Sequence, residues 1–368
     1  MSGAGRRRAH PLRPDSERYQ AGTRACRDRP VSPTPPAVIM GRRDFVRLGV
    51  MLAAQACAPF GMASAQANYP ERPIKLVVPF SAGGVSDTLG RLWAKQMKTL
   101  LGSVFVENQG GGGGSVGAAA VGRADPDGYT ILMSSAGSPV IVPEAASRAP
   151  YNPAKDLEVI SALAFTALAI AIHPSVPART LGELVAYAKA NPGKLSYGSA
   201  GMGTMPQLAG ELFKSLTGLA DIVHVPYRGS NRALADLING QIPMMVTSVT
   251  GAMVDLHRSG KVRMLAVTTP VRTSMAPDIP TAMEAGLPGM RAQNFIVLFA
   301  PARTPKAIVE RIAQANAAAL QDPGFRRQLI ASGLEPYPDP SPRAARALID
   351  GEIERWRAVI DAAGLKVE

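Results

Sequence analysis

The feature that most constrains this chain is a unit that occurs twice: an apolar strand, a loop of glycine and small polar residues, and a helix. In the first copy, the strand Ile74–Val78 leads through Ser81-Ala82-Gly83-Gly84 into a helix whose apolar side chains recur with helical spacing. In the second copy, residues 195–197 lead through residues 198–204 into a helix over residues 205–216. Glycine lets the backbone approach a ligand closely, and the free N–H groups at a helix start favour an anion. Each loop alone is also compatible with an ordinary strand-to-helix connection, but together they predict two α/β lobes that offer backbone N–H groups to one guest.

Two further strands end in loops of small polar residues. Residues 129–133 are followed by residues 134–138, and residues 244–247 lead into Thr247-Ser248-Val249-Thr250. Ligands of open α/β sheets bind at the carboxyl ends of strands, so we expect these loops to border the same site. The strand over residues 222–225 leads to Tyr227, expected to line the cleft, and to Arg228, for which a solvated position is favoured over an anion contact.

The remaining pattern is also that of an α/β protein, and 368 residues with 46% hydrophobic content are enough for two cores. Further strands are predicted over residues 104–107, 168–172, 262–268 and 294–300, and further helices over residues 116–124, 181–190, 233–238, 304–321, 323–331 and 342–363.

Residues 1–67 differ from the rest in composition. Residues 1–39 are rich in arginine and proline without periodicity, and we expect them to be disordered or to precede the true translation start. Residues 40–67 combine a basic start, a short apolar middle and a small-residue end, which is the pattern of a secretory signal peptide cleaved after Ala65 or Ala67. Arg42-Arg43-Asp44-Phe45 resembles a twin-arginine motif, and a Sec signal is the alternative. The mature chain is therefore predicted to reside in the periplasm.

The basic charge does not indicate a nucleic-acid partner. Of the formal net charge of +12, the first 67 residues contribute +7, from 11 arginines and 4 acidic residues. The remainder has no block of Lys and Arg with interleaved aromatic residues, so no nucleic acid is expected. Cys26 and Cys57 both precede residue 68, so we expect no disulfide and no cysteine metal site in the mature chain.

Motifs for catalysis or for a cofactor are missing. The run Gly110-Gly111-Gly112-Gly113-Gly114 lacks the Gly-Lys-Ser/Thr of a P-loop and is expected to lead tightly into a helix. Ser199 is not in a Gly-x-Ser-x-Gly elbow, and nothing in the sequence places a histidine and an acid beside it. Gly201-Met202-Gly203 lacks the third glycine of a dinucleotide fingerprint, and the histidines after residue 67 lack metal-ligand spacing. The sequence therefore predicts recognition without reaction and with no cofactor or metal.

Several motifs, spread from Tyr69 towards the C-terminus, together point to a known family. They are Tyr69-Pro70-x-x-Pro73-Ile74, Val78-Pro79-Phe80-x-x-Gly83-Gly84-x-x-Asp87, Pro126-Asp127-Gly128-Tyr129-Thr130, Asn191-Pro192-Gly193-Lys194, Tyr197-x-Ser199-x-Gly201-x-Gly203-Thr204, Leu208-Ala209-Gly210-Glu211-Leu212-Phe213, His224-Val225-Pro226-Tyr227-x-Gly229 and Gly286-Leu287-Pro288-Gly289. In this order they resemble the Bug or TctC-like substrate-binding proteins of tripartite tricarboxylate transporters.

The resemblance implies a two-lobed periplasmic binding protein of type II, the Venus-flytrap fold, with a two-stranded hinge. Lobe 1 would comprise residues 68–165 and 293–368, and lobe 2 residues 166–292. Such a protein is a monomer without enzymatic activity that closes on a small carboxylate and delivers it to membrane permease subunits. A sensory solute receptor is one alternative role, and an enzyme using Ser199 or Asp87, such as a serine-dependent hydrolase, is the other.

The residues expected to contact the ligand all lie in the loops that follow strands or in the first turn after them. They are Phe80, Ser81, Ala82, Gly83, Gly84, Asp87, Ser135, Gly137, Ser199, Ala200, Gly201, Gly203, Thr204, Tyr227, Thr247 and Ser248.

Two departures from the family pattern bear on the ligand. This chain has Thr247-Ser248 where many relatives carry an acid, and Met205-Pro206-Gln207 where a Ser-x-His is common. An acid at the first position would pair with the ammonium group of an amino acid. Its absence predicts a carboxylate that is not an amino acid, with an apolar body against Met202, Met205 and Tyr227.

Overall fold

The computed structural model describes residues 68–145 and 151–364. The expected signal peptide and the segment before it lie outside the described residues.

The strands belong to one mixed sheet with the order β2-β1-β3-β9-β4-β7-β5-β6, and β8 and β10 pair with β4 beside this path. The strands are β1 (Ile74–Val78), β2 (Val104–Asn108), β3 (Thr130–Ser135), β4 (Leu157–Ile172), β5 (Ser196–Ser199), β6 (Val223–Pro226), β7 (Met244–Ser248), β8 (Arg263–Val267), β9 (Gln293–Pro301) and β10 (Glu335–Pro336).

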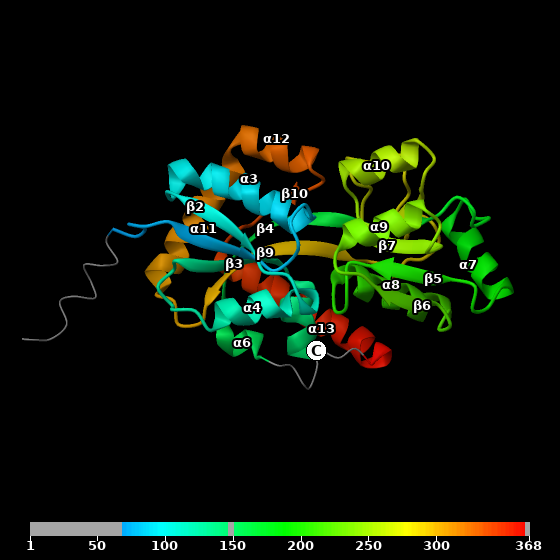
Figure 1. The fold of residues 1–368 in the computed structure, drawn as a ribbon, viewed down its shortest axis with the longest axis horizontal. Helices are drawn as coiled ribbons and strands as arrows, with labels where there is room; N and C mark the ends of the chain where they lie inside the picture. The colour runs from blue at the N-terminus through cyan, green and yellow to red at the C-terminus, as the bar shows by residue number, and fades with distance from the viewer. Residues whose placement is uncertain (1–67, 146–150, 365–368) are drawn as a thin grey trace, which may run out of the picture. The chain divides into compact units, whose positions relative to one another are not determined.

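Helices cover both faces of the sheet, as Figure 1 shows. They are α3 (Val85–Leu100), α4 (Ser115–Gly122), α5 (Val142–Ala145), α6 (Pro153–Asp156), α7 (Leu181–Ala190), α8 (Met205–Thr217), α9 (Ser230–Ile238), α10 (Gly251–Arg258), α11 (Lys306–Gln321), α12 (Pro323–Ala331) and α13 (Pro342–Ala363), with a 3₁₀ turn η1 (Gly112–Gly114) and a π-helical segment η2 (Gly137–Ile141).

Two sets of parallel strands define two lobes. In the first lobe β1 pairs in parallel with β2 and β3, and in the second lobe β5 pairs in parallel with β6 and β7. Between them, β4 and β9 run antiparallel, and the last residues of β4 continue into pairing with β7. The α/β fold with two lobes joined by two long strands agrees with the expectation, while the exact lobe boundaries stay a prediction.

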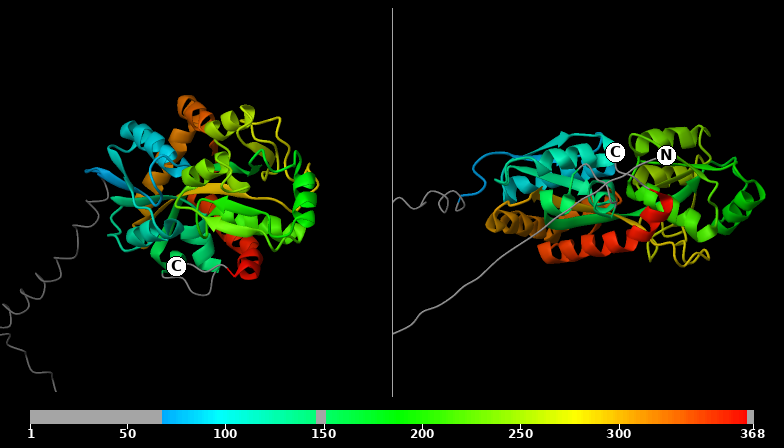
Figure 2. Two further views of the ribbon diagram at one scale, coloured as in Figure 1. Left: turned by 45° about the vertical axis from the view of Figure 1, so that its right-hand side comes forward. Right: turned by 90° about the horizontal axis from the view of Figure 1, so that it is seen from below.

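One cluster of buried apolar side chains includes residues of both lobes. Trp93 on α3 is fully buried, and its indole N–H donates to Asn316 Oδ1 on α11 at 3.0 Å, because a buried indole needs an acceptor. The C-terminal helix α13 packs against β4 and also against α8 of the second lobe, and its Trp356 is fully buried. In the second view of Figure 2, α13 runs along the underside of the molecule. The C-terminal helix therefore contacts both lobes.

Three local predictions need correction. β4 begins at Leu157, well before the predicted residue 168, because its pairing with β9 extends the strand through residues 157–167, where alanines interrupt the residues that favour strands. The helix α10 follows the loop after β7, where no helix was predicted. The sequence Thr281-Ala282-Met283-Glu284 has the pattern of a capping box, which predicts the start of a helix. The reciprocal bonds of the box form between Thr281 and Glu284, but they close a turn and no helix follows.

Candidate functional site

A cavity of about 1010 Å³ lies where the carboxyl ends of the parallel strands of both lobes meet. The first lobe contributes the loop after β1, residues 110–114 after β2 and the end of β3. The second lobe contributes the loop after β5, the turn from β6 into α9 and the end of β7. Loops of both lobes thus surround one space, which is the arrangement that the repeated unit predicted.

Most of the residues predicted as ligand contacts line this cavity. Those that do are Phe80, Ser81, Ala82, Gly84, Ser135, Ala200, Gly201, Gly203, Thr204, Tyr227 and Ser248. Gly83, Asp87, Gly137, Ser199 and Thr247 are not among its lining residues. Met205, expected to touch an apolar ligand body, is fully buried and lies outside the lining, whereas Met202 and Tyr227 line it.

Asp87 holds the first glycine loop from behind. Its carboxylate accepts the Gly83 N–H at 2.9 Å, Arg91 Nε at 3.1 Å and Asn108 Nδ2 at 3.0 Å. Burial alone would raise the pKa of Asp87, but the bonds from Arg91, Gly83 and Asn108 hold this pKa below its ordinary value. Asn108 also donates to Phe80 O at 3.1 Å, so both ends of the loop are fixed.

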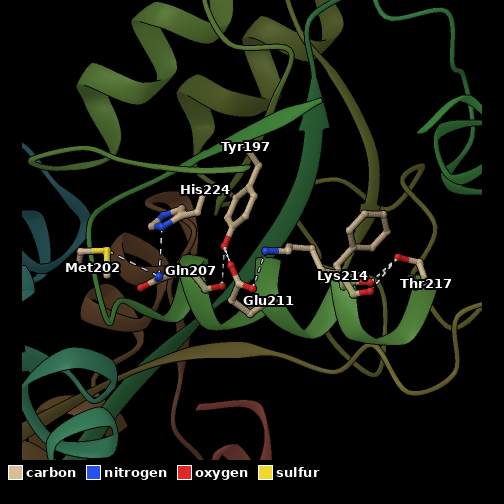
Figure 3. Close-up of polar contacts among 8 residues, drawn as sticks. Tyr197, Met202, Gln207, Glu211, Lys214, Thr217 and His224 are labelled. Carbon is tan, nitrogen blue, oxygen red and sulfur yellow. Dashed lines mark hydrogen bonds and ion pairs between the residues drawn. The ribbon is translucent and has the colours of Figure 1, made fainter. Parts of the chain in front are cut away.

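The second glycine loop rests on a buried polar network that the sequence did not predict. Ser199 Oγ lies 2.7 Å from His224 Nε2. On the other side of the ring, Gln207 Nε2 lies 3.1 Å from His224 Nδ1, as Figure 3 shows. Nothing in the sequence placed a histidine beside Ser199, and the structure brings His224 to it. The pairing of β5 with β6 causes this contact, because it sets Tyr197 opposite His224 with their rings 4.8 Å apart.

This network does not make Ser199 a nucleophile. Gln207 Oε1 accepts the Gly203 N–H, so its amide group must turn its NH₂ towards His224. His224 Nδ1 is then an acceptor, and in a neutral imidazole the proton is on Nε2, which donates to Ser199. Burial, opposed by the charge of Glu211, lowers the pKa of His224 to about 4 and keeps the ring neutral at pH 7. A histidine that donates to the serine cannot act as its general base.

Helix starts at the cavity lack side-chain caps. Four helices, α3, α4, α8 and α9, have N-cap residues that line the cavity: Gly84, Gly114, Thr204 and Gly229. No described side chain caps any of these four helices. The hydroxyl of Thr204 donates to Gly201 O at 2.7 Å and so does not cap α8. Away from the cavity, a side chain caps the start of five helices: α6, α7, α10, α12 and α13. The exception is α11, which starts after Pro305 without a side-chain cap.

The two lobes touch at the base of the cavity. A Cβ atom on Gly137 would lie 2.9 Å from Met205 N, so glycine permits the close approach of η2 to the start of α8. Beside it, Ser135 Oγ donates to Asn294 Oδ1, and Thr166 Oγ1 donates to Ser248 Oγ at 3.0 Å. Gly137 and Ser135 therefore lie at the boundary between the lobes.

Tyr227 is fixed at the wall of the cavity. Its hydroxyl donates to Asp236 Oδ2 at 2.7 Å. Partial burial, together with this bond and the charge of Asp236, raises the pKa of Tyr227 to about 12. The phenol is thus neutral at pH 7, and Asp236 already has a partner.

Sequence reasoning missed several residues of the site. Residues 110–114 were interpreted only as a tight helix entry, and Asn108, Asn231, Arg232 and Asn294 were not considered. One signal was available, since the glycine run follows a strand in the same way as the two glycine loops.

Metal ligation and membrane insertion find no support in the described part of the chain. Residues 68–145 and 151–364 contain no group of three or more His, Cys, Asp or Glu side chains that could hold a metal ion. Within the same residues no helix combines the length and the apolar character needed to cross a bilayer.

Comparison with known proteins identifies the family. Residues 89–365 match the TctC family, described as the tripartite tricarboxylate transporter family receptor. The chain belongs to the TctC family. A solved structure of the periplasmic binding protein BugD is 33% identical, with a TM-score of 0.72 over 81% of this chain and 99% of BugD.

Two other solved TctC-like structures are similar to this chain and contain acids. MatC from Rhodopseudomonas palustris, solved with bound malate, is 31% identical with a TM-score of 0.73, over 79% of this chain and 100% of MatC. A second R. palustris protein, solved with adipate, is 32% identical with a TM-score of 0.74, over 81% of this chain and 99% of that protein. The TctC family and this fold are those of periplasmic solute-binding proteins.

Proposed function

We propose that this TctC-family protein is exported to the periplasm, where it captures a small carboxylate that is not an amino acid and delivers it to the permease subunits of a tripartite transporter. The residues that contact the ligand in this proposal are those of the two glycine loops, Ser135, Tyr227 and the end of β7.

One observation carries the proposal: the four helices whose N-cap residues line the cavity, α3, α4, α8 and α9, all lack a side-chain cap. The first N–H groups of a helix have no partner within the helix, and together with the helix dipole they favour negative charge. A capping side chain supplies that charge or acceptor elsewhere in this fold, as Thr180 does for α7. At the cavity a ligand carboxylate can supply this negative charge and hydrogen-bond acceptor to helices of both lobes at once.

The charge of the cavity supports an acid that lacks an ammonium group. Among the described residues of the lining, Arg228 and Arg232 are the only charged ones. A ligand ammonium group would find no carboxylate there, and an unpaired buried charge is costly. The acids named for MatC and for the adipate-bound protein carry no ammonium group either.

The buried position of Ser199 supports binding without catalysis. Ser199 has no exposed surface, lies outside the cavity lining and accepts hydrogen bonds from Gly201 N and His224. An enzyme of this site would return altered acids, so mass spectrometry of acids after incubation with the protein tests this part of the proposal.

Calorimetry with a panel of organic acids tests the ligand class. We expect micromolar dissociation constants, which correspond to about 8 kcal/mol and need only a few charge-assisted hydrogen bonds. Tight binding of aspartate or glutamate with no response to other acids would contradict it. Loss of uptake of the bound acid after gene deletion would support the transport role, and unchanged uptake with a lost transcriptional response would favour the sensory role.

A further inference from the structure

Arg228 and Arg232 stand out at the wall of the cavity. Both side chains are exposed, and neither has a hydrogen bond or an ion pair with a described residue. Because no acidic residue of the described lining opposes them, they give the cavity two uncompensated positive charges.

The backbone around Arg228 is fixed to the second glycine loop. The residue before it, Tyr227, donates its N–H to Ser199 O at 3.2 Å, and the residue after it, Gly229, donates to Ala200 O at 3.0 Å. Arg228 therefore projects from a turn that is tied on both sides to the loop proposed to hold the ligand carboxylate.

Arg232 lies four residues further along the chain and also lines the cavity. It is in the first turn of α9, which the buried side chains of Ala233 and Leu237 anchor to the second lobe. Its neighbour Asn231 reaches the opposite lobe, since Asn231 Nδ2 lies 3.7 Å from the position that a Cβ on Gly83 would take. The start of α9 thus faces the first lobe at close range.

Neither arginine has an evident role in folding. A cation in the first turn of a helix is disfavoured by the helix dipole, and α9 has no acidic residue in that turn. The nearest acid on the helix, Asp236, is bonded to the hydroxyl of Tyr227. A purely solvated arginine would be the ordinary interpretation on an open surface, but these two border the cavity.

We infer that Arg228 and Arg232 determine specificity by binding a second anionic group, so that the ligand is an acid with two negative charges. The inference rests on the proposed function, in which the first carboxylate occupies the helix starts of the glycine loops. The second group is a carboxylate, sulfonate or phosphate at the other end of the molecule. Guanidinium groups suit all three, because their planar N–H donors match such oxygen pairs.

Comparing the affinities of a diacid and a monoacid with equal carbon numbers measures the contribution of the second negative charge. The probes are succinate, adipate and suberate, each compared with the monoacid of equal carbon number: butyrate, hexanoate and octanoate. For at least one pair, we expect the diacid to bind about tenfold more tightly, the size of one hydrogen bond to a charged group after allowance for exposure. The preference should weaken as salt rises from 10 to 500 mM, because salt screens exposed charges.

The variant R228Q/R232Q removes both charges and leaves shorter side chains that are still polar and can still donate hydrogen bonds. We expect the affinity ratio of the preferred pair to fall to about one, with the affinity for the monoacid changed by less than about twofold. R258Q is the matched control, because Arg258 is an exposed arginine of the same lobe that has no hydrogen bond or ion pair with a described residue and does not line the cavity. Thermal unfolding of all variants verifies that they fold.

The outcomes distinguish this inference from the proposed function. Equal affinities within every pair, or an unchanged ratio in R228Q/R232Q, would overturn the arginine site and leave carboxylate binding in place. Binding of neither diacids nor monoacids would remove the proposed function, and this inference with it.

Discussion

The Gly203 N–H bonds to Gln207 Oε1, and this contact fixes the orientation of the buried amide. The other end of the same amide lies 3.1 Å from His224 Nδ1. Gln207 thereby links the second glycine loop to a histidine that is held neutral. Protonation of His224 should therefore alter the hydrogen bonding of the second glycine loop.

Acid should destabilise the protein through His224. Its pKa is lowered to about 4 in the folded state and is near 6.5 when unfolded, so between these values the unfolded chain binds more protons. This contribution to stability is complete above pH 6.5 and is lost as the pH falls towards 4, by up to about 1.4 kcal/mol per pH unit. Urea unfolding from pH 4 to 8 measures this slope for the wild type. In His224→Gln the slope should become flatter by that amount, and an identical slope in both proteins would contradict the assignment.

Replacing Gln207 should affect the loop and the histidine separately. Gln207→Ala leaves the Gly203 N–H and His224 Nδ1 without partners at a buried position and should cost about 1–3 kcal/mol of stability. Gln207→Glu keeps the acceptor for Gly203 but places a negative charge beside the ring, which favours the protonated histidine. NMR titration of the His224 ring should then give a higher pKa in Gln207→Glu than in the wild type. No change in this pKa would show that the amide and the ring do not interact.

Capping α3 from within the chain should abolish ligand binding. Gly84 has extended backbone, and a Cβ there would make only an ordinary contact with Ser81 O at 3.7 Å, so other residues fit. In Gly84→Asp the carboxylate can take the N–H groups proposed for the ligand, and we expect at least about tenfold weaker acid binding with equal or higher thermal stability. Gly84→Asn is the control, because it caps without charge and should weaken binding less. Unaltered affinity in Gly84→Asp would contradict the role of this helix start.

The close packing of the two lobes should require glycine at position 137, because there is no room for a Cβ atom beside Met205. Gly137→Ala would bring its Cβ to 2.9 Å from Met205 N and 3.1 Å from Met205 Cγ, which forces the segments apart. We expect a loss of about 1–3 kcal/mol of stability by denaturant unfolding, together with weaker acid binding. Gly182→Ala in α7 is the matched control: nothing lies within 4 Å of its Cβ position, so alanine should stabilise the helix by about 0.5–1 kcal/mol. Equal effects of the two substitutions would rule out the steric argument.

Local patterns predicted much of the fold and of the cavity wall. The apolar run of β1 and the glycines after it predicted a loop that lines the cavity, and the same pattern predicted the loop after β5. These signals are local, since strand length, glycine position and helical spacing are read from adjacent residues.

Features that depend on distant partners could not be predicted in this way. The contact of Ser199 with His224 depends on the register of β5 against β6, and the first part of β4 depends on its pairing with β9. The role of Asp87 behind its loop depends on Asn108, which a different strand supplies. Side-chain direction at the cavity, as for Met205, likewise follows from packing and not from its place in the loop.

The uncapped helix starts have a thermodynamic consequence. Three of these N-cap residues are glycine, and a glycine N-cap leaves roughly a few tenths of a kcal/mol of helix stability unrealised in the empty protein, compared with a capping side chain. An anion that reaches α3 and α8 together would serve as a common cap for helices of both lobes, coupling their unfolding into one transition. Protein with bound ligand should therefore unfold at a higher temperature and in a sharper transition, because the ligand completes helix starts that the chain leaves uncapped.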